Sequence, residues 1–393
     1  MVSTLLFVVA AQPQQQPDLY RTIIKKPTGE NGYEEYLQAA DIALAAKVSE
    51  LVEFVEDTNQ RGTKLDRQRM LVRQLGRLPS LVEQGNKKPV FYPNEMDFDT
   101  LLPELSAFRW VGRAMVIKAD VHFADGQVNQ GFSTLASVIE FGDKLSGSGP
   151  LIHNLVGRAI NQPALQSLAK HANLMSVPAA NDLQSRTKVL LNSPSPWINA
   201  MRIEMKAIVD SMPMFMDRID DFVGTEGMTS DLAAIKSLSD EQKKQVVNEL
   251  RFTVTRHYQA RLDMLQRPEK EWPKLAAQID SIQGPDNPIA AAVFEAIVPA
   301  FARIDLYEIA RRTHFRLIAA YSEVVKFRWD HGYYPGSLDQ LEDTSVAYDP
   351  LTDGPFEYRR TETGFELYSK GTEETGRIDF FYSPPRSSNA KPD

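Results

Sequence analysis

The longest amphipathic stretch of the chain lies near its C-terminal end. From Phe301 onward, apolar residues recur at intervals of three or four, and charged residues fall between them. This spacing places the apolar side chains on one face of a helix of about 30 residues, roughly 45 Å long. Gly332 follows the last apolar turn, where a glycine in the left-handed conformation commonly ends a helix. The apolar positions are Ile304, Leu306, Ala310, Leu317, Ala320, Tyr321, Val324 and Phe327.

A short antiparallel sheet is predicted directly after this helix. Residues 356–360 and 365–369 alternate between apolar and polar side chains, and the four-residue loop between them contains Gly364, at which we expect a positive φ. This pattern is typical of a hairpin with one apolar face. A third run at 378–382 extends the sheet. Four tyrosines are assigned to the apolar face, against the long helix: Tyr333, Tyr334, Tyr358 and Tyr368.

Several short motifs follow the helix in a fixed order. They are His331-Gly332-Tyr333-Tyr334-Pro335, Leu338 with Leu341, Asp349-Pro350, Pro355-Phe356 with Tyr358, and the run 364–371. This ordered set, over about residues 306–376, resembles the periplasmic domain of type II secretion pseudopilins of the major (G) class. The resemblance implies a small pseudopilin-like α+β domain over residues 299–382. In that family the helix begins as an apolar membrane segment, whereas here it is amphipathic and follows a long preceding chain, so we do not expect a pilus subunit.

The same resemblance implies a calcium site. The family binds calcium in an Asp-rich loop after the last matched strand, and calcium takes six to eight oxygen ligands. The corresponding loop here contains Arg377 and lacks the aspartate pattern. The candidate calcium ligands are Ser369, Thr372, Glu373, Glu374 and Asp379. No other cofactor is expected.

The preceding part of the chain, residues 31–298, predicts a solenoid-like, all-α helical array. Apolar periodicity indicates helices at 33–56, 65–82, 102–123, 128–145, 151–172, 180–191, 196–223, 239–266, 272–282 and 288–297. The pair around Ala124-Asp125-Gly126 resembles one unit of the tetratricopeptide class, although no second copy recurs at a fixed period. Prolines at 163 and 213 are expected to kink or divide their helices.

Capping signals mark two helix starts, that of the helix at 239–266 and that of a further short helix predicted to begin at Ser337. Ser239 with Gln242, and Ser337 with Gln340, have the spacing of a capping box, in which the two side chains satisfy each other's backbone N–H groups.

The first eleven residues are almost wholly apolar and end in Val9-Ala10-Ala11. This pattern is typical of a signal peptide, although its start lacks Lys or Arg. A polar linker is predicted at 12–30 and a disordered tail at 383–393. No stretch approaches the roughly 20 apolar residues of a transmembrane helix. We therefore expect a periplasmic or secreted protein.

Composition narrows the chemistry further. The chain has no cysteine, which excludes disulfides and thiolate metal sites. Its net charge is −8, and the part after His331 holds 12 acidic and 6 basic residues. Basic patches interleaved with aromatic residues are absent, so nucleic acid is not an expected partner.

No catalytic motif stands out. The six histidines, expected on helix surfaces or at caps, show no paired metal-ligand spacing: His122, His153, His171, His257, His314 and His331. Glu204 lies beside Arg202 among several methionines, which are expected to fill the core. A surface ion pair with Arg202 is the simpler interpretation of Glu204, and a buried functional carboxylate is the alternative.

These patterns favour an exported bacterial envelope protein that acts in binding or assembly, without catalysis. Protein partners would contact the helical array and the pseudopilin-like domain. The alternative is an exported hydrolase with a carboxylate-based site in a helical groove. A third possibility is that the protein is a structural module whose long helix docks into a fibre. The sequence leaves the oligomeric state open.

Overall fold

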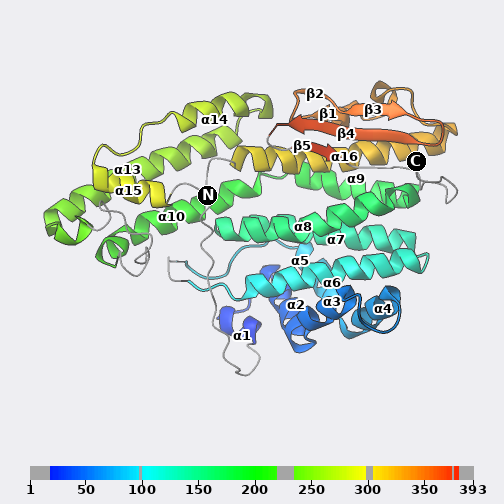
Figure 1. Cartoon of the computed structure of the whole chain (residues 1–393), viewed down its shortest axis with the longest axis horizontal. Coiled ribbons are helices and arrows are strands. Elements are labelled where there is room, and N and C mark those ends of the chain that lie inside the picture. The colour runs from blue at the N-terminus through cyan, green and yellow to red at the C-terminus, as the bar shows by residue number, and fades with distance from the viewer. Residues whose placement is uncertain (1–17, 97–99, 219–233, 298–303, 374–375, 380–393) are drawn as a thin grey trace.

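A computed structural model describes residues 18–96, 100–218, 234–297, 304–373 and 376–379. Within these ranges the chain forms fourteen α-helices and five short strands (Figure 1). The fold is mainly α with a small antiparallel sheet at the C-terminal end, as the sequence predicted. The first eleven residues, Pro299 and the tail at 383–393 lie outside the described residues.

Five helices come first in the chain, and α1 to α4 lie at the bottom of Figure 1. They are α1 (Leu19–Ile23), α2 (Tyr33–Ala45), α3 (Val48–Glu56), α4 (Lys64–Gln74) and α5 (Leu78–Asn86). The prediction of two long helices here was wrong, because left-handed residues break each one: Lys47 has φ 49° and Gly76 has φ 50°. The linker prediction was also wrong in part, because α1 lies within it. The Asp41 carboxylate anchors α1 by accepting from the backbone N–H groups of Leu19 (2.7 Å) and Tyr20 (3.0 Å).

Four helices stack above α1 to α4: α6 (Glu104–Ala124), α7 (Val128–Ser146), α8 (Leu151–His171) and α9 (Val177–Asn192). Gly126, with φ 75°, makes the predicted turn between α6 and α7. Helices α7 and α8 approach each other closely at two glycines. A Cβ on Gly157 would lie 2.2 Å from the Gly142 carbonyl oxygen, so only glycine permits this contact. Helix α8 continues through Pro163.

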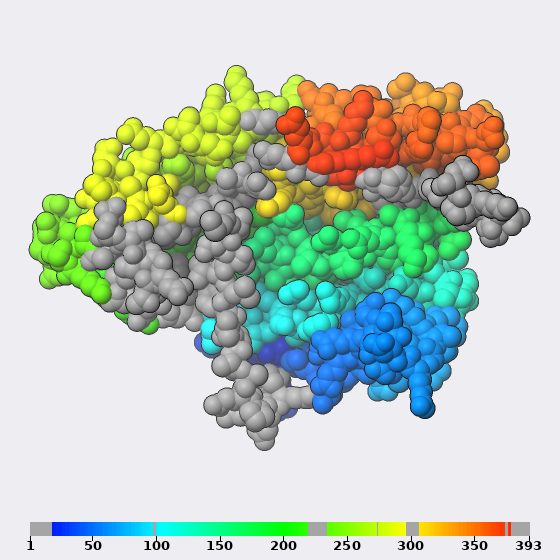
Figure 2. All heavy atoms as spheres, viewed as in Figure 1, coloured from blue at the N-terminus to red at the C-terminus, as the bar shows by residue number. Residues whose placement is uncertain are grey.

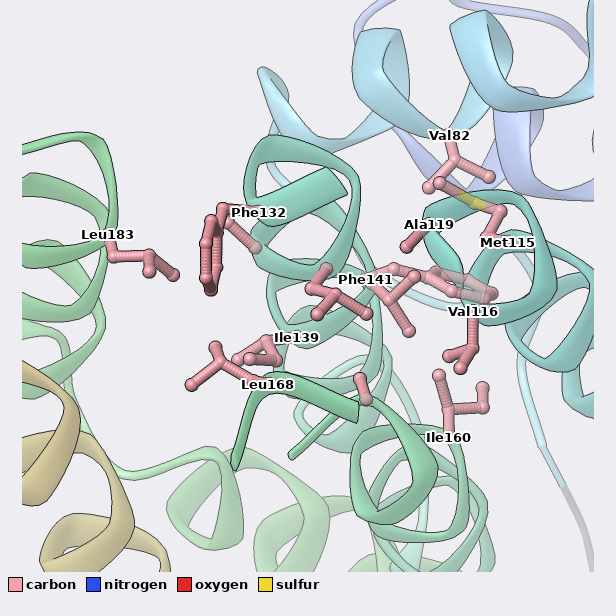
Figure 3. Close-up of a cluster of buried hydrophobic side chains, with 14 of the residues drawn as sticks. Val82, Met115, Val116, Ala119, Phe132, Ile139, Phe141, Ile160, Leu168 and Leu183 are labelled. Carbon is pink, nitrogen blue, oxygen red and sulfur yellow. The ribbon is translucent and has the colours of Figure 1, made fainter. Parts of the chain in front are cut away.

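The interior of this stack is apolar. Figure 3 shows side chains from α5 to α9 converging on one cluster, with Phe132 and Phe141 of α7 near its middle. This core is continuous, and it extends from Leu19 in α1 to Ile378 in the sheet.

A second core lies to one side. It is formed by α10 (Pro196–Asp217), α13 (Asp240–Leu265), α14 (Trp272–Asp280) and α15 (Pro288–Ile297). Met201, Met212 and Met216 are buried in it, which confirms that these methionines fill core space. The capping box at Ser239 and Gln242 is present and starts α13.

The long helix α16 (Ile304–His331) runs between α9 and the sheet (Figure 1). The middle of its predicted apolar face is buried, at Leu317, Ala320, Tyr321 and Val324, whereas Leu306, Ala310 and Phe327 are partly buried. Gly332 has φ 78° and ends the helix as expected. The helix contributes Phe315 to the first core and Ile309 to the second.

The sheet lies over α16 as the outermost layer of this face (Figure 2). Strand β1 (Tyr348–Asp349) pairs with β2 (Gly354–Pro355). Strands β3 (Glu357–Arg360), β4 (Phe365–Thr372) and β5 (Gly376–Asp379) form an antiparallel sheet in that order. The predicted hairpin is therefore confirmed. A third strand is present at Gly376–Asp379, and residues 380–382 of the predicted run lie outside the described residues.

Three details of the predicted C-terminal region were wrong. Tyr368 lies on the other face of β4 from buried Phe365 and Leu367, because side chains alternate along a strand, and the Arg377 guanidinium covers its ring at 3.6 Å. Gly364 does not adopt a positive φ. Ser337 makes no capping hydrogen bond, because the Gln340 side chain accepts instead from the backbone N–H of Gly336 at 2.6 Å.

Within the described residues, none of the helices combines the length and the apolarity that crossing a bilayer requires.

Candidate functional site

An open pocket of about 340 Å³ lies where the helical body meets the sheet. Its walls come from the end of α13, a three-residue 3-10 helix η3 (Glu269–Glu271), α14, α16 and β1. The lining residues are Leu265, Arg267, Pro268, Glu269, Lys270, Trp272, Arg312, Arg316 and Tyr348. Four of these nine side chains are cationic, and Glu269 is the one carboxylate among them.

Two arginines of α16 form a clamp around Glu269. Arg312 Nη1 donates to Glu269 Oε1 at 2.6 Å, and Arg316 Nη1 donates to Oε2 at 2.5 Å. Arg316 Nη2 also approaches Oε1, at 3.3 Å. The two arginines are four residues apart, so they lie on one face of the helix and point to the same spot. The side chains of all three residues are 11–20% exposed.

Aromatic rings hold the guanidinium groups in place. The Arg312 guanidinium lies over the Trp272 ring at 5.4 Å, and the Arg316 guanidinium lies over the Tyr348 ring at 5.2 Å. Trp272 Nε1 donates to the Arg267 carbonyl at 2.9 Å, and the Tyr348 hydroxyl donates to Asp353 at 2.8 Å. These hydrogen bonds therefore fix the orientation of the Trp272 and Tyr348 rings. Burial and the Asp353 carboxylate together raise the pKa of Tyr348 to about 12, so the hydroxyl stays protonated at neutral pH.

A buried ion-pair chain, defined as Asp143, Arg311, Glu308, Arg312, Glu269 and Arg316, connects the pocket to the interior. Glu308 accepts from Arg312 Nε at 2.9 Å and from Arg311 at 2.7 Å to each oxygen. Arg311 Nη1 then reaches Asp143 of α7 at 2.9 Å. This chain of alternating charge fixes the angle of the clamp relative to the helical body.

Burial and neighbouring charges shift the pKa values of the residues in this ion-pair chain in opposite directions. Burial alone would raise the pKa of Glu308, but the guanidinium groups of Arg311 and Arg312 outweigh it and hold that pKa below its usual value. Burial raises the pKa of Asp143, although Arg311 pulls it in the opposite direction. For Arg311 burial is outweighed by Asp143 and Glu308, so its pKa is raised and it stays charged.

The pocket can therefore hold a small anion. Fixed guanidinium groups in a partly dry site are well suited to carboxylate or phosphate, because they offer parallel N–H donors. Exposed Lys270 and Arg267 at the rim add positive charge without lying deep in the pocket.

The predicted calcium ligands are only partly described. Ser369 is fully buried, and its hydroxyl accepts from the backbone N–H of Gly371 at 3.0 Å. Thr372 and Glu373 are exposed, while Glu374 and the side chain of Asp379 lie outside the described residues. In the part of the chain that is described, no three His, Asp or Glu side chains converge on a possible metal position. The calcium site stays a prediction.

The other sequence candidates lie away from the pocket. Glu204 accepts from the backbone N–H of Leu151 at 3.2 Å, and burial raises its pKa. Arg202 is exposed, and among the described residues no ion pair joins it to Glu204. The surface ion pair was therefore the wrong interpretation: Glu204 is a partly buried carboxylate bound to the backbone of α8.

All six histidines lie within helices, but His153 and His257 are buried, so the expectation of a surface or capping position was wrong for these two. His153 Nε2 lies 3.2 Å from the Tyr33 hydroxyl, which in turn donates to Glu104 at 2.8 Å. Burial lowers the pKa of His153 to about 3, so the ring is neutral. Burial also raises the pKa of Glu104.

Comparison with known protein families, with curated proteins and with solved structures finds no match. The function of the site must therefore be argued from its own chemistry.

Proposed function

We propose that this chain is a non-catalytic binding protein of the bacterial envelope, and that it holds an anionic group in the pocket formed by Arg312 and Arg316. The observation that carries this proposal is the excess of cationic side chains over carboxylates in the pocket lining, with Arg312 and Arg316 held in fixed positions. Arg267, Lys270, Arg312 and Arg316 line the pocket together with Glu269 alone. Since Arg312 and Arg316 are held by aromatic rings, they are organised before any ligand arrives, which reduces the entropic cost of binding.

The position of the pocket supports a role in binding or assembly. Its walls join the helical body to the C-terminal sheet, and α16 contributes residues to both. A ligand seated here would contact both parts of the molecule at once. The same proposal includes three further expectations. The protein is exported, its C-terminal sheet is pseudopilin-like, and protein partners bind its helical surface.

Anion titration of the whole protein tests the proposal. Acetate, phosphate and sulfate would be titrated at constant ionic strength, with heat of binding and Trp272 fluorescence as readouts. We expect saturable binding that Arg316→Gln weakens by about tenfold or more, because a hydrogen bond to a charged group contributes about 1.5–3 kcal/mol. A Trp272→Phe variant identifies the fluorescence signal.

Arg328→Gln is the matched control, since it makes the same change at an exposed position of the same helix. It should bind anions like the unmodified protein. The proposal is overturned if no anion saturates, or if Arg316→Gln and Arg328→Gln bind equally well.

A further inference from the structure

Glu269 already occupies the arginine clamp with a carboxylate. Its two oxygens accept from Arg312 Nη1 at 2.6 Å and from Arg316 Nη1 at 2.5 Å. This geometry suits a planar group with two equivalent oxygens, of which one faces Arg316 and the other lies between both guanidinium groups. A carboxylate fits that arrangement directly, because parallel N–H donors match its two oxygens.

The element that carries Glu269 is held much less firmly than the clamp. Helix η3 has three residues, none of them buried, and its backbone is closed by one hydrogen bond from Glu271 N–H to the Pro268 carbonyl at 2.9 Å. Short segments with few buried apolar contacts open at low free-energy cost. The Glu269 side chain can therefore leave the clamp without disturbing the core.

The arginines, in contrast, stay in place when Glu269 leaves. Arg312 keeps its bond to fully buried Glu308, and the rings of Trp272 and Tyr348 still cover the two guanidinium groups. Arg316 would lose its two hydrogen bonds to Glu269, and a partly buried guanidinium without a partner is costly. Another carboxylate arriving in the pocket would remove that cost.

We propose that Glu269 is an internal substitute for the ligand, and that the ligand is a carboxylate which displaces it from Arg312 and Arg316. This inference rests on the proposed function and specifies its ligand. Binding then couples entry of the carboxylate to release of the Glu269 side chain from the clamp. The carboxylate belongs either to a free organic acid or to the C-terminus of a peptide.

Competition at the clamp gives the test. The whole protein and its Glu269→Gln variant would be titrated by calorimetry with acetate, with phosphate, with a blocked tripeptide carrying a free C-terminal carboxylate, and with the same tripeptide as its amide. Removing the internal competitor should tighten binding of the carboxylates at least tenfold, while the amide should bind neither protein. Glu271→Gln, an equal change at an exposed residue of η3, should bind like the unmodified protein.

A further variant and the comparison between ligands separate the possible outcomes of this experiment. Glu269→Asp, whose shorter side chain cannot reach both arginines equally, should give an intermediate gain and serves if Glu269→Gln does not fold. Tighter binding of the tripeptide acid than of acetate assigns the ligand to peptide termini, and equal binding assigns it to free acids. Equal affinity of the unmodified protein and both Glu269 variants overturns the competition. Preference for phosphate overturns the carboxylate assignment, and failure of every anion overturns the proposed function itself.

Discussion

Arg311 Nη1 lies 2.9 Å from Asp143 Oδ1, although the two residues are 168 positions apart in the sequence. The side chains are 10% and 8% exposed, so the pair joins α16 to α7 inside the molecule. Arg311 also holds both oxygens of fully buried Glu308. The orientation of the pocket clamp therefore depends on a contact made deep in the helical body.

Replacing Arg311 with an uncharged residue should destabilise the protein strongly. Arg311→Met leaves Asp143 buried without its guanidinium and reduces the support of Glu308, so we expect a loss of about 3–5 kcal/mol in the free energy of unfolding. Asp143→Asn should cost less, about 1–3 kcal/mol, because Arg311 keeps Glu308 as a charged partner. Urea denaturation followed by circular dichroism gives both values from the midpoint and slope.

An exposed ion pair provides the comparison. Arg359 and Glu366 pair at 2.8 Å across the outer sheet, with side chains 71% and 35% exposed. Arg359→Gln should change the free energy of unfolding by less than about 1 kcal/mol, as exposed pairs usually do. A loss at Arg311 no larger than the loss at Arg359 would contradict the structural role given to the buried chain.

The glycine contact between α7 and α8 predicts a second large effect. In Gly142→Ala the new Cβ would lie 2.1 Å from Asn161 Oδ1 and 2.5 Å from the Gly157 carbonyl oxygen, so the helices must move apart. Alanine favours a helix over glycine by about 1 kcal/mol, but overpacking of this kind costs about 1–3 kcal/mol or more. We expect net destabilisation, measured as a lower midpoint of thermal unfolding.

Gly284→Ala, in the loop between α14 and α15, is the control for adding a Cβ without crowding. A Cβ on Gly284 would meet nothing within 4 Å. The midpoint of thermal unfolding of Gly284→Ala should therefore stay near that of the unmodified protein. If Gly142→Ala is equally harmless, the close approach of α7 and α8 does not limit stability.

The sequence predicts the helices better than it predicts their ends. Apolar periodicity places α6, α7 and α16 within a few residues, because each long helix buries one continuous face. The break at Lys47 is invisible to periodicity, since a lysine at φ 49° carries no local signal of a helix end. Two capping boxes of equal spacing also differ in outcome, because the Gln340 side chain finds the backbone of Gly336 instead.

The pocket is harder to predict, because it is assembled from distant segments. Glu269 and Arg316 are 47 positions apart, and nothing in either local sequence indicates that they meet. The nearest signal was the Arg311-Arg312 pair on a helix that otherwise packs in the core. Buried His153 was missed for the same reason, since its partners Tyr33 and Glu104 come from two other helices.

His153 predicts an acid-sensitive stability. Burial lowers its pKa from 6.5 to about 3, so between these values the unfolded chain binds a proton that the folded protein does not. Stability therefore falls as pH drops from about 6.5 toward 3, by up to about 1.4 kcal/mol per pH unit. The raised pKa of Glu104 acts in the opposite direction, because the folded protein holds that proton more tightly.

Comparing two proteins isolates the contribution of His153. The free energy of unfolding would be measured from pH 7 to pH 4 for the unmodified protein and for His153→Gln, which keeps a polar group facing Tyr33. The difference between the two proteins should shrink or reverse as the pH falls, because the variant has no proton to take up on unfolding. A constant difference across this range would show that His153 is not held neutral in the folded state.

The contacts of α16 bear on the predicted domain boundary at residue 299. Buried Leu317, Ile318 and Ala320 belong to the core that also contains the α9 residues Ala180 and Leu183. A fragment of residues 299–393 would keep the sheet over one side of α16, but it would expose the side that α9 covers. We therefore expect this fragment to melt without a cooperative transition when its circular dichroism is followed with temperature. A cooperative transition would show that the sheet and α16 suffice as a domain, and would strengthen the pseudopilin-like interpretation of this region.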